Sequence, residues 1–542
     1  MTEGRKKGSF IKQAAILAAA GILVRVLGFA YRVPLTNMIG DQGNAIYSAG
    51  YYIYTFQLIL SSAGLPAAIS KMVSERRALG QYGNAHRVFR VSLTVSTVLG
   101  GIFAVLMFLF AAEISSWANS PESYYCILTL SPTLLIVAIM SAYRGYFQGM
   151  NTMVPTAFSQ IIEQIFNAVF SVYLAWILLG VGVADGQKNI PLGAAGGTAG
   201  TGIGALAGLI TITVWHLHSG KELKREVKTE AAGIPKESFG ELAKTLFATA
   251  WPIIAGTAVF SLTNLIDMNM VTRLLEFGGY SHTMAQELYG QLSGKYVTLT
   301  TLPVSISTAV ATAAIPTIAA SMKLKQMDQV ERKMGLTLRL SMLISVPAAV
   351  GIGALGKPII QMLFPKASDG GILLTVGAVS IIFLAFVQTS TGVLQGIGHI
   401  KVPVVGAILG AIAKIIFNIL LVPIPALNVV GAVLSTTACY AAAGIFDIVM
   451  LTRITQTKFD YKSCLVKPIA ASCVMGAAVL AVYALLMMLC HNNTVSTLLA
   501  ICVGVVVYAA AILAMHGVAE EDVLALPMGR RIADVLKKYH WL

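Results

Sequence analysis

The stretch AAILAAAGILVRVLGFAYRVPLTNM, residues 14–38, decides the fold. It has the length of about 20 apolar residues that a helix needs to cross a bilayer, yet it contains Arg25 and Arg32. Because the two arginines are close to two helical turns apart, both guanidiniums lie on one face, roughly 10 Å apart along the axis. A charge at such depth usually faces a bundle interior or a water-filled path. The stretch therefore predicts the floor of a cationic cavity, as is typical of a transporter.

The composition extends this membrane assignment to the whole chain. Of its 542 residues, 56% are hydrophobic and only 11% are charged, against about 25% charged in a soluble domain. Lipid cannot satisfy backbone polar groups, and the apolar runs lack the alternation of strands, so the spans are expected to be helices. The sequence predicts an all-α polytopic membrane protein with about 14 transmembrane helices. The expected spans are residues 10–38, 45–70, 88–112, 123–147, 154–180, 192–218, 245–275, 287–322, 335–356, 370–396, 401–422, 429–452, 465–490 and 495–517.

The net charge of +14 follows from topology and does not indicate nucleic-acid binding. Most of the 38 Lys and Arg residues fall in the loops on the side of the N-terminus. The opposite loops hold Lys188, Arg273, Lys357 and Lys366. This is the positive-inside distribution, and it predicts a multi-pass protein with both termini in the cytoplasm.

The two halves of the chain resemble each other in sequence. The matching elements, in the same order, are Gln148-Gly149 with Gln395-Gly396, Ile165-Phe166-Asn167 with Ile416-Phe417-Asn418, and Gly193-Ala194 and Thr198 with Gly431-Ala432 and Thr436. Both halves begin on the cytoplasmic side, so the repeat is parallel. Transporters built this way commonly bind substrate between the halves and alternate access by rocking.

The repeat and the charge distribution together predict the domain limits. We expect an N-terminal six-helix bundle at 1–218, a cytoplasmic connector at 219–244, a C-terminal six-helix bundle at 245–456, two further helices at 457–517 and an amphipathic cytoplasmic tail at 518–542.

Three cations are candidates for substrate binding, each with a structural alternative. Arg25 lies too deep to reach the inner surface easily, and its alternative role is a pair with a buried acid. Arg32 lies nearer the outer face, where it could instead extend outward. Lys295 begins a polar arc in its span that continues through Thr298, Thr301, Ser305, Thr308 and Thr312, so a substrate-facing and a structural lysine are both open.

Three further charged residues are candidates for coupling or gating. Glu163 and Lys414 hold matching places in the repeat, four residues before the shared asparagine, which suggests an ion pair near the pseudo-two-fold axis. Such a pair would favour one conformation more than it would stabilise the fold. Asp267 could bind a coupling Na⁺ or proton, or neutralise Arg25, and the sequence leaves both open.

A cavity with several cations and few carboxylates favours an anionic substrate, since guanidinium matches phosphate oxygens. No phosphate-binding loop of the ATPase kind is present. The glycine-rich stretch 193–208 indicates close helix packing. No group of cysteines has metal-ligand spacing, and no cofactor is expected beyond a coupling Na⁺ or H⁺.

With these residues in view, the chain resembles the multidrug/oligosaccharidyl-lipid/polysaccharide exporter superfamily. Within it, the chain is most similar to the Gram-positive branch of stage V sporulation protein B and the MurJ-type lipid II flippases. The similarity covers nearly the whole chain, and it is carried by residues 25–52, 64–81, 143–164 and 520–538.

The resemblance implies a V-shaped pair of pseudo-symmetric six-helix bundles, with two C-terminal helices that form a groove for a lipid tail. Arg25 and Arg32 fall on the two arginines of the family's first-helix motif, with a spacing one residue longer. Asp41 falls on that motif's acid, which makes it a further candidate for coupling or gating. Lys295 lies where the family has an arginine. One departure concerns span two, where the stretch LILSSAGLP (58–66) lacks the basic residues of Gram-negative MurJ proteins.

The resemblance therefore implies a non-enzymatic flippase in a bacterial cytoplasmic membrane. Its substrate would be an undecaprenyl-pyrophosphate-linked cell-wall saccharide, such as lipid II or a related polysaccharide precursor, in vegetative growth or sporulation. The alternative in the same fold is a cation-coupled multidrug antiporter, which would favour more carboxylates than cations in its cavity. A membrane glycosyltransferase would need acids on long outer loops, and the outer loops here are short. The sequence leaves the identity of the saccharide, the energy source and the oligomeric state open.

Overall fold

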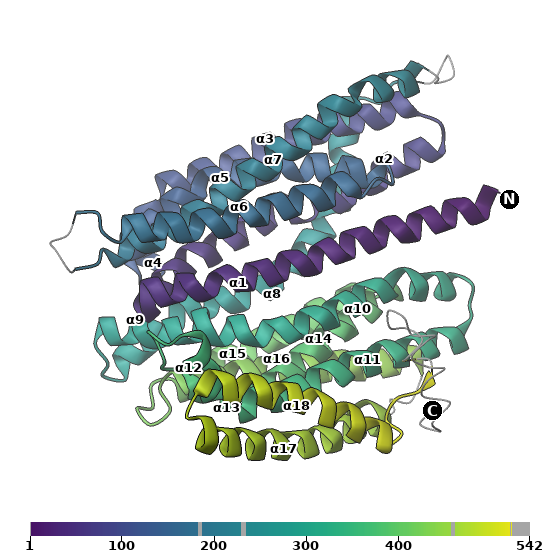
Figure 1. Cartoon of the computed structure of the whole chain (residues 1–542). Coiled ribbons are helices and arrows are strands. Elements are labelled where there is room, and N and C mark those ends of the chain that lie inside the picture. The colour runs from purple at the N-terminus through teal and green to yellow at the C-terminus, as the bar shows by residue number, and fades with distance from the viewer. Residues whose placement is uncertain (1, 183–186, 229–234, 457–460, 521, 523–542) are drawn as a thin grey trace. The chain divides into compact units, whose positions relative to one another are not determined.

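The computed structural model describes residues 2–182, 187–228, 235–456, 461–520 and 522, and these residues form helices and short connections without strands (Figure 1). By compactness the chain divides into unit 1, Met1–Thr272, and unit 2, Arg273–Leu542. The prediction of an all-helical membrane protein is confirmed. Among the described residues, 12 stretches are long and apolar enough to cross a membrane, so the count of about 14 is not confirmed.

Two differences account for the lower count. Residues 10–38 and 45–70 contribute to a single apolar stretch, Ala19–Ala78. The expected span at 245–275 is helical, but it is not among the 12 stretches.

Unit 1 contains the first helices of the chain. They are α1 (Thr2–Leu58), η1 (Ile59–Ala63), α2 (Leu65–Ala78), α3 (Tyr82–Leu109), α4 (Ala111–Trp117), η2 (Pro121–Ser123), α5 (Tyr124–Gly149), α6 (Val154–Leu178), α7 (Ile190–Lys228) and most of α8 (Phe239–Phe277).

Unit 2 contains the remaining elements. They are α9 (His282–Gly290), η3 (Gln291–Tyr296), α10 (Val297–Lys323), α11 (Met327–Ala354), α12 (Gly356–Leu363), α13 (Gly371–Gly377), α14 (Val379–Gly396), α15 (Lys401–Leu421), α16 (Val429–Thr455), η4 (Lys462–Val466), α17 (Lys467–Cys490) and α18 (Asn493–Ala514).

A backbone kink at Gly40 divides α1 and explains why the sequence predicts two spans there. Gly40 has φ +70° and ψ −172°, a conformation that glycine adopts without the steric cost of a side chain. The Thr36 hydroxyl lies 3.3 Å from Asn44 Oδ1 and bridges the kink. The kink therefore has a fixed geometry, close to the residues expected to bind substrate.

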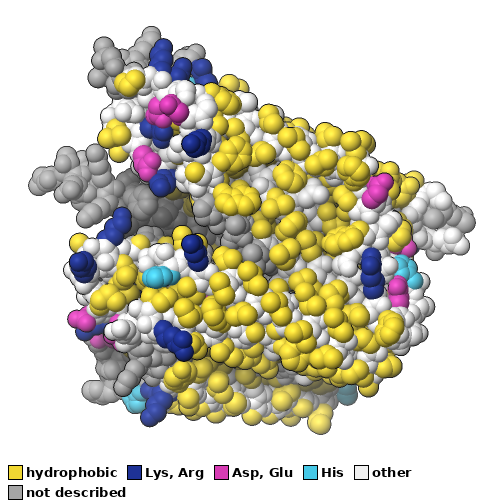
Figure 2. Space-filling view, turned by 180° about the vertical axis from the view of Figure 1, so that it is seen from behind, with side chains coloured by type: hydrophobic (Ala, Val, Ile, Leu, Met, Phe, Trp, Pro, Cys, Tyr) yellow, Lys and Arg dark blue, Asp and Glu magenta, His cyan; other side chains and the backbone are white. Residues whose placement is uncertain are grey.

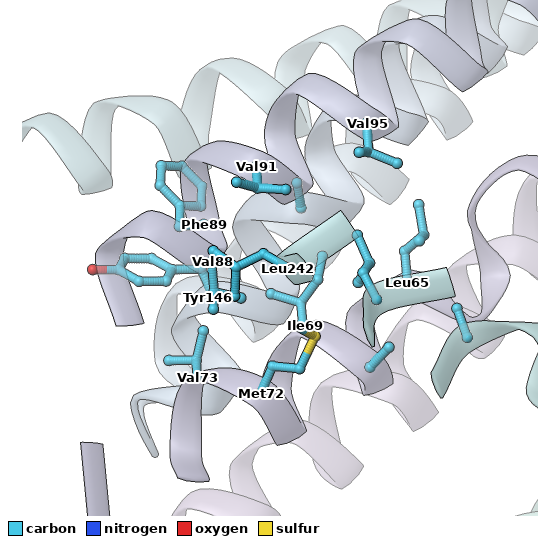
Figure 3. Close-up of a cluster of buried hydrophobic side chains, with 14 of the residues drawn as sticks. Leu65, Ile69, Met72, Val73, Val88, Phe89, Val91, Val95, Tyr146 and Leu242 are labelled. Carbon is cyan, nitrogen blue, oxygen red and sulfur yellow. The ribbon is translucent and has the colours of Figure 1, made fainter. Parts of the chain in front are cut away.

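The inner core of unit 1 joins α8 to the earlier helices. Leu65, Ile69 and Met72 of α2 pack with residues of α3, with Tyr146 of α5 and with Leu242 of α8 (Figure 3). The guanidinium of Arg76 in α2 also binds the Glu237 carboxylate just before α8, with Nε 2.7 Å from Oε1. These contacts place the start of α8 in unit 1.

The boundary between the two compact units falls after Thr272, whereas the sequence predicts the boundary between the two bundles at the connector 219–244. The expected connector at 219–244 is helical at both ends, because α7 continues to Lys228 and α8 begins at Phe239. The expected amphipathic tail at 518–542 lies mostly outside the described residues.

Glycines spaced by four residues bring α7 close to α6. A Cβ on Gly200 would lie 2.2 Å from the Ser171 backbone nitrogen, and one on Gly204 would lie 2.5 Å from the Glu163 carbonyl oxygen. Gly196 meets the α6 backbone at Leu174 in the same way, and Gly208 lies less tightly between Met140 of α5 and Glu163 of α6. The prediction that the glycine-rich stretch serves close helix packing is confirmed.

In unit 2, α15 packs against α16 as α6 packs against α7, and α17 packs on α18 and α11. Tyr508 of α18 donates a hydrogen bond to the Leu343 carbonyl of α11 over 2.9 Å, and Arg339 of α11 binds Asp522 with Nε 2.8 Å from Oδ1. Within unit 2, α11 therefore fixes both α18 and the residue Asp522 that follows it.

The surface fits a lipid environment. Figure 2 shows apolar side chains over the length of the helices and charged side chains toward the helix ends. The apolar residues include exposed Val98, Ile102 and Val105 on α3 and Leu485 and Met488 on α17.

Candidate functional site

Arg32 of α1 is held by aromatic rings. Its guanidinium carbon lies 5.3 Å from the centroid of the Tyr47 ring and 5.5 Å from that of Tyr51, and Tyr31 and Tyr52 are also close. The two stacking tyrosines follow the Gly40 kink in the same helix, so the kink folds α1 back toward the arginine. Among the described residues, no carboxylate forms an ion pair with Arg32.

This arrangement leaves the N–H groups of a half-buried cation available to an anion. Each stacking contact stabilises the cation by about 0.5–2 kcal/mol without using its hydrogen-bond donors. Arg32 is therefore suited to bind a phosphate or diphosphate group.

The other two residues of the first-helix motif have different surroundings. Arg25 lies two turns before Arg32 on α1 and is exposed. Asp41 directly follows the Gly40 kink and is half-buried. The expected roles of Arg25 in substrate binding and of Asp41 in gating stay predictions.

Glu163 of α6 takes its ion-pair partner from α5. Its Oε2 lies 2.6 Å from Arg144 Nη2, and Arg144 Nε also donates to the Ser159 hydroxyl over 3.1 Å. The Arg144 side chain has 14% of its surface exposed, and the Glu163 side chain has 26%. The expected pair of Glu163 with Lys414 stays a prediction, and Arg144 is the cation that neutralises Glu163 within unit 1.

Asp267 is buried in α8, with 7% of its surface exposed. Just beyond it, the amide of Asn269 donates to the Trp117 carbonyl over 2.6 Å, so this part of α8 is fixed to the end of α4. The geometry leaves both expected roles for Asp267 open.

Lys295 is almost fully buried in η3, and it binds backbone carbonyls. Its Nζ donates to the carbonyl oxygens of Ala367 over 2.6 Å and Asp369 over 3.0 Å, and it lies 5.9 Å from the Phe364 ring centroid. In this conformation the lysine holds the segment between α12 and α13 in place. Its expected role in substrate binding stays a prediction.

The polar arc beyond Lys295 lies on the less buried side of α10. Thr301 and Thr312 are exposed, whereas Val304, Ser307 and Ala311 are buried. This distribution fits the predicted water- or protein-facing side of the span.

Lys414 of α15 is also buried, with 1% of its surface exposed. Its Nζ donates to the Thr436 hydroxyl of α16 over 2.9 Å, and that hydroxyl donates to the Ala432 carbonyl. One turn further along α15, Asn418 accepts a hydrogen bond from Ser435 of α16. Lys414 therefore belongs to a polar seam inside unit 2, and its gating role stays a prediction.

Sequence reasoning missed several residues that the structure brings into these groups. Arg144 stands near the end of the expected span 123–147, and Tyr47 and Tyr51 stand one helical turn apart in a stretch that carries the family resemblance. Asp447 is a third omission. It is an acid inside the expected span 429–452, and acids within spans are functional candidates by default.

A comparison with known protein families assigns the chain to one of them. Residues 10–322 match the family described as polysaccharide biosynthesis protein, which is more than half of the chain. The chain belongs to this polysaccharide biosynthesis family. The matched residues of this chain include Arg32, Glu163, Asp267 and Lys295, whereas Lys414 lies beyond them.

Curated relatives of this family member share sequence over most of their length. The lipid II flippase MurJ of Bacillus subtilis (strain 168) is 29% identical over 482 residues, which cover 86% of both chains. Stage V sporulation protein B of the same organism is 27% identical, over 86% of this chain and 87% of the relative.

Solved structures show the same fold. A lipid II flippase MurJ in an inward closed conformation superposes with a TM-score of 0.63 at 16% identity, covering 92% of this chain and 98% of that one. An inward-facing multidrug resistance MATE transporter of the MOP superfamily superposes with a TM-score of 0.65 at 14% identity, covering 82% and 98%. The fold is therefore that of the MOP superfamily, as the sequence predicts.

Proposed function

We propose that the protein is a flippase for an undecaprenyl-pyrophosphate-linked cell-wall saccharide, either lipid II or a related polysaccharide precursor. It acts by alternating access in the bacterial cytoplasmic membrane, with both termini in the cytoplasm, and it catalyses no covalent reaction. The observation that carries the proposal is the half-buried Arg32, stacked on Tyr47 and Tyr51 without a carboxylate partner among the described residues. Membership of the polysaccharide biosynthesis family supports the saccharide part of the proposal.

The chemistry of the Arg32 group suits this substrate. A diphosphate is a dianion or more at neutral pH, and guanidinium offers it a fork of N–H donors. The flat faces of tyrosine rings suit the apolar faces of sugar rings, and the tyrosine hydroxyls can donate and accept hydrogen bonds. We therefore expect the half-buried Tyr51 to contact the saccharide beside the diphosphate, whereas Tyr47, with 2% of its surface exposed, supports Arg32 from the protein side.

A multidrug antiporter is the second candidate, because the same fold serves a MATE transporter. Such a protein would bind lipophilic cations, and a free guanidinium in its cavity would repel them. The charge of Arg32 therefore favours the flippase.

The purified full chain, reconstituted in proteoliposomes, tests the proposal. Fluorescent lipid II is placed in the membrane, and its transfer between leaflets is followed with a reagent that reaches one leaflet only. We expect transfer well above that of protein-free vesicles, and no efflux of ethidium under an imposed ion gradient. Ethidium efflux without lipid II transfer would contradict the proposal and favour the antiporter.

A further inference from the structure

Asp447 of α16 is a buried acid in unit 2 that no part of the proposed substrate binding uses. None of its surface is exposed, and neither carboxyl oxygen accepts a hydrogen bond of good geometry from the described residues. Ser390 and Thr391 of α14 stand beside the carboxyl group. The Thr391 hydroxyl is itself buried without a partner, whereas the Ser390 hydroxyl donates to the Phe386 carbonyl over 2.6 Å.

The packing of α15 leaves space for this carboxyl group. A Cβ on Gly406 would lie 2.5 Å from Asp447 Oδ1, so the carboxyl group rests directly on the α15 backbone. One turn before Asp447, Gly444 packs on Phe383, Phe386 and Val387 of α14. Asp447 therefore lies where α14, α15 and α16 meet, next to apolar side chains and two hydroxyl groups.

The helices around Asp447 offer it no positive partner. The helices that pack most on α16 are α13, α14 and α15, and the first two contain no charged or titratable residue. On α15, Lys401 is exposed at the first position, and Lys414 lies two turns beyond Gly406 and binds Thr436. On α16 itself, Arg453 is exposed. The described structure shows no ion pair that involves Asp447.

An ionised carboxylate is stable in such a place only with a cation beside it. A bound metal cation would need about six oxygen ligands if it were divalent, and the described neighbours supply only the carboxyl group and two hydroxyls. A proton needs no such shell, because it neutralises the acid and lets it donate a hydrogen bond to an adjacent oxygen.

We propose that Asp447 is a proton-binding site, neutral in this conformation, which releases its proton when unit 2 rearranges during transport. The protonation itself depends only on the local geometry. Its coupling to transport rests on the proposed flippase function.

Infrared spectroscopy of the purified full chain tests the protonation independently of transport. A neutral carboxylic acid has a carbonyl-stretch band that shifts on exchange into D₂O. We expect this band at pH 7 in the wild type, its loss in Asp447→Asn, and its retention in Asp328→Asn, which removes an exposed acid of α11. A band unchanged by Asp447→Asn would overturn the proposal. Loss of the wild-type band on addition of Na⁺ at constant pH would overturn it in favour of a sodium site.

A second variant covers the case in which Asp447→Asn does not fold. Thr391→Val removes the hydroxyl beside the carboxyl group and should shift the band. Thr437→Val removes a hydroxyl of α16 that already donates to the Val433 carbonyl, and it should leave the band in place. Identical bands in the two threonine variants and the wild type would contradict the assignment to Asp447.

The coupling is tested by lipid II transfer at several pH values in the same proteoliposomes. A single-proton site can change the rate by up to about tenfold per pH unit. We expect a pH-dependent wild-type rate and a rate in Asp447→Asn that varies less than about twofold over the same range. Equal pH dependence in both would overturn the coupling. If the wild type transfers no lipid II at all, the proposed function and the coupling both fail, while the infrared result still decides the protonation.

Discussion

The helices α5, α6 and α7 of unit 1 and α14, α15 and α16 of unit 2 occupy matching places in the repeat, yet they hold opposite charges. Glu163 of α6 corresponds to Lys414 of α15 through the shared asparagine. Counting from the shared glutamine, Arg144 of α5 corresponds to Thr391 of α14. The acid in unit 2 stands instead on α16, where Asp447 takes the place of Leu209 in α7, counted from Thr198 and Thr436.

The difference shows that packing and charge are set by separate residues. Small residues bring the paired helices together in both units, as Gly200 does in α7 and Gly410 in α15. The charged positions then differ without changing the packing. In unit 1, Arg144 neutralises Glu163. In unit 2, Asp447 rests on Gly406 of α15, and Lys414 lies eight residues further along that helix, which is a rise of about 12 Å.

The largest effect on stability is expected from breaking the ion pair of unit 1. Arg144→Met leaves the Glu163 carboxylate without its cation in a largely buried place, and we expect it to lower the free energy of unfolding by about 2–3 kcal/mol. Thermal unfolding in detergent measures the change. In the double variant Arg144→Met/Glu163→Gln the uncompensated charge is gone, so most of the stability should return. A double variant no more stable than the single one would mean that the pair does not hold the helices.

A smaller effect is expected where α7 meets α6. Gly200→Ala places a methyl group against the Ser171 backbone, which cannot move as a side chain can, and should cost about 1–3 kcal/mol. Gly101→Ala on α3 is the matched control, because a Cβ there meets nothing within 4 Å. The control should leave stability unchanged or raise it by up to about 1 kcal/mol. Equal unfolding temperatures for the two variants would contradict the close packing.

Removal of the buried cation of unit 2 should have less effect than removal of Arg144. Lys414→Met keeps most of the side-chain volume, loses a hydrogen bond to Thr436, and removes the cost of burying a charge. We expect a change of about 1 kcal/mol or less. A loss of stability as large as that of Arg144→Met would mean that Lys414 neutralises an acid as Arg144 does. That result would contradict the difference proposed between the two units.

The smallest effect concerns the start of α8, where Glu241 and Ser238 cap the helix. The Ser238 hydroxyl and backbone N–H both donate to the Glu241 carboxylate, which lowers the pKa of that exposed carboxyl group. Because the pKa is lower in the folded chain, this contribution to stability is present at neutral pH and is lost as the pH falls through the folded-state value. A carboxyl NMR titration should show the pKa of Glu241 rising toward its ordinary value in Ser238→Ala. An unchanged pKa would exclude the cap.

The sequence predicted the helical membrane fold, the internal repeat and the packing role of the glycine-rich stretch, because hydropathy and small-residue spacing depend on local pattern. It did not predict that Arg144 neutralises Glu163 or that Tyr47 and Tyr51 hold Arg32. Those contacts depend on the rotation of neighbouring helices and on the kink at Gly40, and neither can be read from a hydropathy pattern. Lys295 illustrates the same limit, since its carbonyl partners come from a segment more than 70 residues further along the chain.

The most direct test of the account is lipid II transfer by Arg32→Ala in proteoliposomes, with the variant's fold checked by its unfolding temperature. Loss of a charge-assisted contact to a diphosphate should slow transfer by about ten- to hundredfold, and Arg32→Lys should retain part of the rate. Arg453→Ala, which removes an exposed arginine at the end of α16, should transfer at the wild-type rate. Wild-type transfer by a folded Arg32→Ala would contradict the claim that this cation receives the substrate.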